Sequence, residues 1–245
     1  MSAGESRFIE RKSVTARFAA GQRQVAEAAA PAPPDAKQLK EIQAHCKRIA
    51  QALAGKCGVE FRGRILEIGA GGAWLSAELS KLPRVVEIVA TDFKAEALRE
   101  EAPRVFAWLN ARAAKITRTP MDAHHLDFPK SHFDVVIAVG ALQHGLNLPL
   151  LLKECCRVLK PGGSLIAVRE PVQPLAKGKA GSRRSAAESS VHTVAEYEAL
   201  FARAGFTVKV RDLKLAGRWR YHYDRLVKGV LHARYAIVGT KSSRR

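Results

Sequence analysis

Three acidic residues stand where apolar runs of the chain end, and carboxylates in such places can bind a ligand. Glu67 lies near the end of one run, two residues before Gly69, where the glycine-rich segment 69–72 begins. Asp92 follows the apolar run 85–90, and Asp122 comes after a further run. In open α/β sheets the ligand lies beyond the carboxyl ends of the strands. We therefore expect the three carboxylates to line one crevice.

The glycine-rich segment limits what this crevice can hold. Glycines allow a tight turn and the close approach of a ligand, although many strand-to-helix turns contain glycine without binding anything. A dinucleotide fingerprint starting at Gly69 needs glycine at position 74, where the chain has Trp74. No Gly-Lys-Ser/Thr sequence follows, which excludes a P-loop. Glu67 would repel a pyrophosphate but attract an ammonium group.

The two aspartates extend this chemistry to a nucleoside. Asp92 can accept hydrogen bonds from both hydroxyl groups of a ribose, or it caps the helix that follows. Asp122 can accept the amino group of an adenine with Met121 packed on the ring, or it is a surface turn residue. A ligand with an ammonium group, a ribose and an exocyclic amine but no phosphate matches S-adenosylmethionine (SAM).

Alternating strands and helices must position these residues. The apolar pattern predicts strands near 65–68, 85–90, 114–117, 134–139, 164–168, 206–210 and 235–238, and helices near 73–82, 95–110, 148–159 and 193–204. The segment 160–163 reads as a turn after the third of these helices. Such alternation indicates an α/β fold with a parallel sheet and helices on both faces. The last strand follows without a regular crossover helix, so we expect it to be antiparallel.

The N-terminal part is predicted to be a helical extension over residues 1–60. Residues 1–30 are rich in helix formers and are stopped by the prolines at 31, 33 and 34, after which Asp35 caps a helix to about Leu53. Residues 61–245 then form the main domain. Within it, 171–192 reads as a flexible basic loop from its glycines, prolines and small residues.

Composition narrows the class of protein. The chain has 245 residues, of which 47% are hydrophobic and 26% charged, as expected for a globular domain. No apolar run reaches the ~18 residues of a transmembrane segment, and the N-terminus lacks a secretory signal. The four cysteines form no C-x-x-C pair, so we expect a reducing, cytoplasmic location. The histidine spacing predicts no metal site.

The net charge of +18 is concentrated near the C-terminus. Residues 171–245 contain 16 Lys and Arg against 5 Asp and Glu. This excess predicts an anionic partner, either nucleic acid or lipid head groups, unless it is simply a solvated surface. Residues 218–225 interleave aromatic side chains with arginines, which suits stacking on rings and pairing with anions. The same spacing also fits an amphipathic helix.

At these positions the chain resembles the class I SAM-dependent methyltransferases, in particular the type 11 subgroup. The resemblance rests on residues 66–72, 90–92, 121–123, 133–137, 141–144 and 157–163, and more loosely on 192–206. It implies a Rossmann-like seven-stranded sheet with an antiparallel last strand and helices on both faces. It also implies that Glu67 and residues 69–71 hold the methionine end of SAM, Asp92 the ribose hydroxyls and Asp122 the adenine amine. The predicted cofactor-binding residues are Glu67, Gly69, Ala70, Gly71, Asp92, Phe93, Met121, Asp122, Ala123, Val139 and Gly140. Ala73 stands where the pattern often has a third glycine; we expect alanine, being small and helix-forming, to do little harm there.

The predicted activity is methyl transfer from SAM to a small-molecule acceptor, anionic or aromatic, by in-line displacement. His144, after the fourth strand, is the first candidate for a general base, or else it orients a loop. Glu170, after the fifth strand, is the second, or else it pairs with a neighbouring arginine. His124 and His125 are interpreted as ordinary loop histidines. The alternatives are an RNA or other nucleic-acid methyltransferase that uses the basic C-terminal surface, and a non-catalytic SAM-binding regulator.

Overall fold

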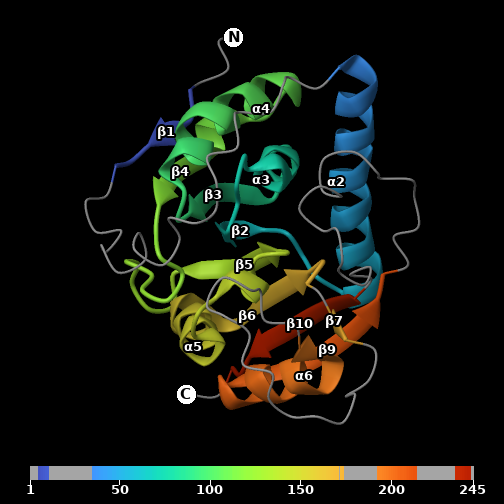
Figure 1. The fold of residues 1–245 in the computed structure, drawn as a ribbon, viewed down its shortest axis with the longest axis vertical. Helices are drawn as coiled ribbons and strands as arrows, with labels where there is room; N and C mark the ends of the chain where they lie inside the picture. Colours follow the sequence, from blue (N-terminus) through green and yellow to red (C-terminus); the bar gives the residue numbers. More distant parts are fainter. Residues whose placement is uncertain (1–4, 11–34, 171, 174–191, 214–234, 244–245) are drawn as a thin grey trace.

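The structure is a computed structural model of the chain, and it describes residues 5–10, 35–170, 172–173, 192–213 and 235–243. The described strands form an eight-stranded sheet in the order β1-β4-β3-β2-β5-β6-β10-β9, with β7 and β8 as a separate pair (Figure 1). The strands are β1 (Arg7–Phe8), β2 (Gly63–Ile68), β3 (Val85–Asp92), β4 (Ile116–Pro120), β5 (Phe133–Val139), β6 (Leu159–Val168), β7 (Val172–Gln173), β8 (His192–Thr193), β9 (Phe206–Asp212) and β10 (Tyr235–Lys241). The first six are parallel, and β10 is antiparallel to both β6 and β9. The predicted Rossmann-like sheet with an antiparallel last strand is confirmed, but it has one strand more than the seven expected, the edge strand β1.

Helices cover both faces of this sheet, also as predicted. The helices are α2 (Ala36–Cys57), α3 (Trp74–Leu79), α4 (Ala102–Trp108), α5 (Leu148–Val158) and α6 (Val194–Arg203), with short helical turns at Ala97–Glu101, Ala113–Lys115 and Leu142–His144. One apolar core joins α2, α3 and α4 to the sheet, and a second joins α5 and α6 to it. Alternate residues of a strand enter opposite cores, as Ile65 and Leu66 do in β2. None of the described helices is both long and apolar enough to cross a membrane.

Helix α2 packs along one side of the molecule, beside α3 (Figure 1). Asp35 caps its start in a reciprocal pair with Gln38, and Gly58 ends it with a left-handed backbone, φ 67°. The helix therefore ends at Cys57, four residues beyond the predicted end at Leu53. Its buried face contains Ile42, His45, Cys46, Ile49 and Leu53, so a histidine lies within an apolar stripe.

The N-terminal edge differs from the prediction. Within the segment expected to be helical, Arg7–Phe8 is a strand that pairs with β4 at the edge of the sheet. Arg118 of β4 explains its position, because the guanidinium stacks on the Phe8 ring and donates to the carbonyl of Ser6. The prediction for residues 11–30 lies outside the described residues.

Three further predicted elements differ from the structure. The third strand begins at Ile116 rather than Ala114, since residues 113–115 form a turn of 3-10 helix. The helix predicted over 95–110 contains a π-helical turn at 97–101, next to Pro103, which lacks the N–H that an α-helical turn uses. The segment 160–163, predicted to be a turn, lies inside β6.

The predicted loop at 171–192 is described only at its ends. There Val172–Gln173 and His192–Thr193 pair in parallel as β7 and β8. The rest of that loop lies outside the described residues, and so does the aromatic and arginine-rich segment 218–225. The predicted binding of an anionic partner by residues 171–245 therefore stays a prediction.

Candidate functional site

Glu67, near the end of β2, is held against the first turns of α3. Its Oε2 atom accepts hydrogen bonds from the backbone N–H of Ser76, at 3.0 Å, and from the Ser76 hydroxyl. The hydrogen bonds of this carboxylate within the described residues all use Oε2, which leaves Oε1 for a ligand. Burial raises the pKa of Glu67 to about 7, although the hydrogen bonds from Ser76 oppose the rise. A ligand ammonium group would favour the ionised form.

The glycine-rich loop is shaped by two close constraints. Gly69 has φ 65°, and a Cβ atom there would lie 2.5 Å from the Cβ of Ala141, so this glycine lets the loop after β5 pack against it. Gly71 also has a left-handed backbone, φ 51°, but a Cβ there would meet nothing within 4 Å. The loop is thus packed against Ala141 at Gly69 and open at Gly71, where a ligand can approach the backbone.

Ala73 has a left-handed backbone too, with φ 55°, and it precedes α3 as its N-cap. The helix propensity of alanine therefore has no bearing here, and that part of the prediction is wrong. A left-handed backbone costs a residue with a Cβ about 1–2 kcal/mol. This cost accounts for the third glycine that the family pattern often has at this position.

Asp92 ends β3 and is tied to the glycine-rich loop. Its Oδ2 accepts the N–H of Gly71 at 2.8 Å, and its Oδ1 accepts the N–H of Lys94 at 2.9 Å. Burial raises the pKa of Asp92, and these two hydrogen bonds oppose the rise. Asp92 does not cap the helical segment that follows, because the helical residues begin only at Ala95. Each oxygen keeps lone pairs for a further donor, as two ribose hydroxyls would require.

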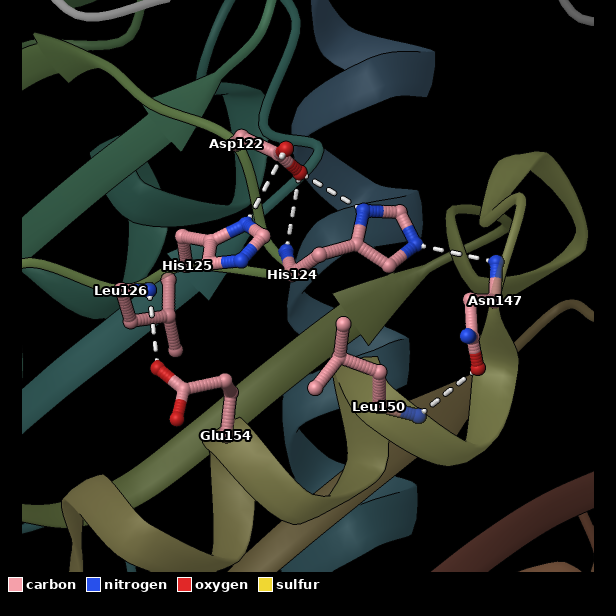
Figure 2. Close-up of polar contacts among 7 residues, drawn as sticks. All are labelled: Asp122, His124, His125, Leu126, Asn147, Leu150 and Glu154. Carbon is pink, nitrogen blue, oxygen red and sulfur yellow. Dashed lines mark hydrogen bonds and ion pairs between the residues drawn. The ribbon is translucent and has the colours of Figure 1, made fainter.

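Asp122 follows β4 and is part of a buried network. Figure 2 shows the ring of His124 between the Asp122 carboxylate and the backbone of Asn147. Nδ1 of His124 lies 2.6 Å from Asp122 Oδ1, and Nε2 accepts the N–H of Asn147 at 3.2 Å. Because that N–H can only donate, Nε2 carries no hydrogen, and the ring donates to Asp122 through Nδ1. Burial alone would raise the pKa of Asp122, but the hydrogen bonds from His124 hold it below its ordinary value.

This network corrects the interpretation of His124 as an ordinary loop histidine. His124 is only 5% exposed, whereas the His125 side chain is 78% exposed. Asn147, which His124 contacts, also caps α5 by accepting the N–H of Leu150 (Figure 2). The ring therefore joins the loop after β4 to the start of α5. The Asp-x-His spacing is the sequence signal that could have indicated this contact, because an aspartate often accepts the N–H of the second residue after it, as Asp122 accepts that of His124.

The remaining predicted cofactor residues occupy the same edge of the sheet. The N–H of Met121 donates to the carbonyl of Asp92 at 2.9 Å, which joins the ends of β4 and β3. The N–H of Gly140 donates to the carbonyl of Val168 at 2.8 Å, at the ends of β5 and β6. Ala70 donates in the same way to Thr91. Phe93 and Ala123 directly follow Asp92 and Asp122, and Val139 ends β5.

His144 lies near Asp92 at this edge, in the helical turn that follows β5. Their charges are close enough for each to shift the pKa of the other. Burial lowers the pKa of His144, and Asp92 partly opposes this. The imidazole is therefore neutral near pH 7 and able to accept a proton.

Glu170 is buried and holds the loop on which His144 lies. Its Oε1 accepts the N–H groups of Ala141 and Leu142 at 3.0 and 3.1 Å, and its Oε2 accepts that of Gln143 at 3.1 Å. These bonds go to the backbone rather than to an arginine side chain. Burial raises the pKa of Glu170 to about 7, against the effect of the three N–H groups.

These residues fit SAM. Carboxylates stand at the ends of three neighbouring strands, β2, β3 and β4, around a glycine loop whose outer residue is open. That donor set suits an ammonium group, two hydroxyls and an amine. Among the described residues there is no group of three His, Cys, Asp or Glu side chains that could hold a metal ion. Sequence reasoning missed Ser76, because its contact with Glu67 appears only when α3 folds back onto β2.

The central part of the chain matches a known family. Residues 66–167 match the type 11 family described as a methyltransferase domain. This match, which covers less than half of the chain, supports a methyltransferase domain of the class I SAM-dependent type 11 family in residues 66–167. SAM is the methyl donor of this family.

Several curated proteins are similar to part of the chain. The ubiquinone/menaquinone biosynthesis C-methyltransferase UbiE of Pseudomonas fluorescens is 31% identical over 112 residues, 45% of this chain and 43% of that protein. The biotin biosynthesis bifunctional protein BioHC of Cellvibrio japonicus is 31% identical over 105 residues, 42% of this chain and 18% of that protein. The chain thus matches less than half the length of either relative.

Solved structures share the fold at lower identity. A methyltransferase from Haloferax volcanii, solved in complex with the Trm112 methyltransferase activator, has a TM-score of 0.63 at 16% identity and covers 84% of this chain and 95% of its own. The cyclase SpnF has a TM-score of 0.64 at 18% identity and covers 80% and 82%. At this identity the likeness shows the fold alone, and the cyclase illustrates that the fold does not specify one reaction.

Proposed function

We propose that this protein transfers a methyl group from SAM to a small-molecule acceptor by in-line displacement. The observation that carries the proposal is the joint placement of Asp92 and Glu67. The Asp92 carboxylate accepts the N–H of Gly71, the open residue of the loop, and the Glu67 carboxylate uses Oε2 for Ser76, which leaves Oε1 for a ligand. The relatives support a small acceptor, because UbiE and BioHC are both named for the biosynthesis of small molecules.

The residues that would hold SAM follow from the site. Oε1 of Glu67 would accept a hydrogen bond from the ammonium group, and Asp92 would accept those of the ribose hydroxyls. Oδ2 of Asp122 would accept a hydrogen bond from the adenine amine. His124 keeps the Asp122 carboxylate oriented through its other oxygen. When bound, SAM supplies a methyl group on a positively charged sulfur, so an electron pair of the acceptor can displace a neutral thioether. Most of the catalytic effect would then come from holding the two reactants in line, which contributes about 7–11 kcal/mol in favourable cases.

His144 and Glu170 take different parts in this proposal. His144, neutral near pH 7 and close to Asp92, would accept a proton from a hydroxyl or ammonium acceptor. Glu170 acts as a positioning residue, because its oxygens accept three backbone N–H groups of the loop that contains His144. The same loop packs on Gly69, so its position also affects the cofactor pocket.

Calorimetry tests the cofactor site first. The Asp92→Ala variant should bind SAM at least about tenfold more weakly, because a charge-assisted hydrogen bond contributes about 1.5–3 kcal/mol. The matched control is Asp134→Asn at the opposite, amino-terminal end of β5, where Asp134 pairs with Lys160 and the N–H of Arg64. This control should leave SAM affinity unchanged. Equal affinity of wild type and Asp92→Ala would reject the proposed ribose contact.

Turnover measurements test the acceptor class and the role of His144. Acceptor classes are screened for release of S-adenosylhomocysteine, and the His144→Ala variant is compared with wild type on any acceptor found. Loss of a general base lowers turnover by about 100-fold or more. An unaltered rate with intact SAM binding would remove His144 from the reaction.

A further inference from the structure

Arg169 extends the site beyond the residues that hold SAM. It directly follows β6, whose Val168 pairs with Val139 of β5. Its carbonyl oxygen would lie 3.5 Å from a Cβ placed on Gly140. Arg169 is half-buried and has a left-handed backbone, φ 59°. Such a conformation costs about 1–2 kcal/mol for a residue with a Cβ, and strain of this kind is concentrated at functional sites.

His45 of α2 orients this arginine. One guanidinium nitrogen of Arg169 lies 2.7 Å from Nε2 of His45, although the two residues are 124 positions apart in the chain. Burial, together with the charges of Arg169 and Arg48, lowers the pKa of His45 to about 4. His45 is therefore neutral at physiological pH and accepts a hydrogen bond through Nε2. The pair carries one positive charge, which lies on a planar guanidinium whose N–H donors form a fixed fork.

The same arginine lies within electrostatic range of the proposed cofactor site. Burial raises the pKa of the Cys46 thiol to about 12, and the charges of Glu67 and Arg169 act on it in opposite directions. Cys46 is thus near both, on the helix that contains His45. The adjacent Glu170 directs its carboxylate to the backbone of the loop at 141–143, so consecutive residues contact different elements.

We propose that Arg169, oriented by His45, is a subsite that binds a carboxylate at the methyl-transfer crevice. The inference rests on the proposed function and adds an acidic group to what the site recognises. Arginine suits this task because its fork of N–H donors can bind both oxygens of a carboxylate. Two molecules can supply the carboxylate, namely the acceptor and the methionine part of the cofactor.

Two pairs of ligands distinguish these sources by calorimetry. The first pair is S-adenosylhomocysteine and its decarboxylated analogue, which keeps the ammonium group. The second pair is 4-hydroxybenzoate and 4-hydroxybenzamide, titrated into protein saturated with S-adenosylhomocysteine. In at least one of these pairs, the wild-type protein should bind the ligand with the carboxylate about tenfold or more tightly than the ligand without it. The Arg169→Gln variant should lose that preference. An effect on the first pair assigns the carboxylate to the cofactor, and an effect on the second assigns it to the acceptor.

Matched variants separate this subsite from general charge. Arg48→Gln removes an exposed positive charge that also acts on His45, and it should leave the preference for the acid unchanged. His45→Leu removes the acceptor that orients Arg169 and should reduce the preference while thermal unfolding stays cooperative. Arg169→Lys should restore part of it, since lysine keeps the charge without the fork.

The outcomes also distinguish this proposal from the broader one. If wild type binds S-adenosylhomocysteine but Arg169→Gln leaves the acid preference of both pairs as in wild type, the carboxylate subsite is rejected and the proposed function stands. If wild type binds neither S-adenosylhomocysteine nor SAM, the proposed function is rejected, and the subsite with it.

Discussion

Glu67 should make cofactor affinity depend on pH. Burial raises its pKa from the ordinary 4.5 to about 7, so the carboxyl group is largely protonated below that pH. Only the ionised form attracts an ammonium group strongly. The affinity for S-adenosylhomocysteine, which keeps the ammonium group and is not consumed, should therefore increase as pH rises through about 7.

The magnitude follows from the position of the pKa. Below about pH 7 the ionised fraction falls about tenfold per pH unit, which corresponds to about 1.4 kcal/mol of binding free energy per unit. The measurement is a calorimetric titration with S-adenosylhomocysteine at several pH values from about 5.5 to 7.5. A plot of the logarithm of the dissociation constant against pH should approach a slope of about −1 at the acid end.

Two controls isolate Glu67 from other groups with a perturbed pKa. The first is 5′-methylthioadenosine, which has the ribose and adenine but no ammonium group, so its affinity should lack this slope. Titration of Asp92 or Glu170 would affect both ligands alike. The second is Glu67→Gln, whose amide oxygen can still accept from Ser76 and which should bind S-adenosylhomocysteine without the slope. Equal slopes for both ligands, or an unchanged slope in the variant, would refute the assigned contact.

Three further predictions concern stability and the cofactor network. Gly69→Ala should lower the free energy of unfolding by about 2 kcal/mol more than Gly71→Ala, because both strain the backbone but only the first creates a clash; equal losses in urea unfolding would contradict this. His124→Leu should cost about 1–3 kcal/mol of unfolding free energy and weaken SAM binding, because Asp122 loses its buried donor; calorimetry showing wild-type affinity would argue against the network. Without ligand, the raised pKa of Glu67 means that its stabilising contribution is full below about pH 4.5 and is lost as pH rises through about 7. Glu67→Gln should therefore gain stability relative to wild type over that range in pH-dependent thermal melts, and a constant difference would exclude the raised pKa.

Local patterns were sufficient to predict most of the framework. Strands such as Phe133–Val139 contain short apolar runs, here residues 135–139 between Asp134 and Gly140, and α2 repeats its apolar residues at helical spacing. These periodicities depend on near neighbours in the chain, so they can be recognised without the fold. The places of Glu67, Asp92 and Asp122 at strand ends follow from the same patterns, because parallel strands present their carboxyl ends at one edge.

Only the tertiary structure decided how these side chains act. Three contacts join separate elements of the fold, namely the Ser76 contact of Glu67, the His124 bridge from Asp122 to Asn147 and the pairing of Arg169 with His45. The strand Arg7–Phe8 likewise exists because β4 offers an edge to pair with, not because of its own pattern. The raised pKa values of Glu67 and Glu170 arise from desolvation, and burial is a property of the packed chain rather than of the residue type.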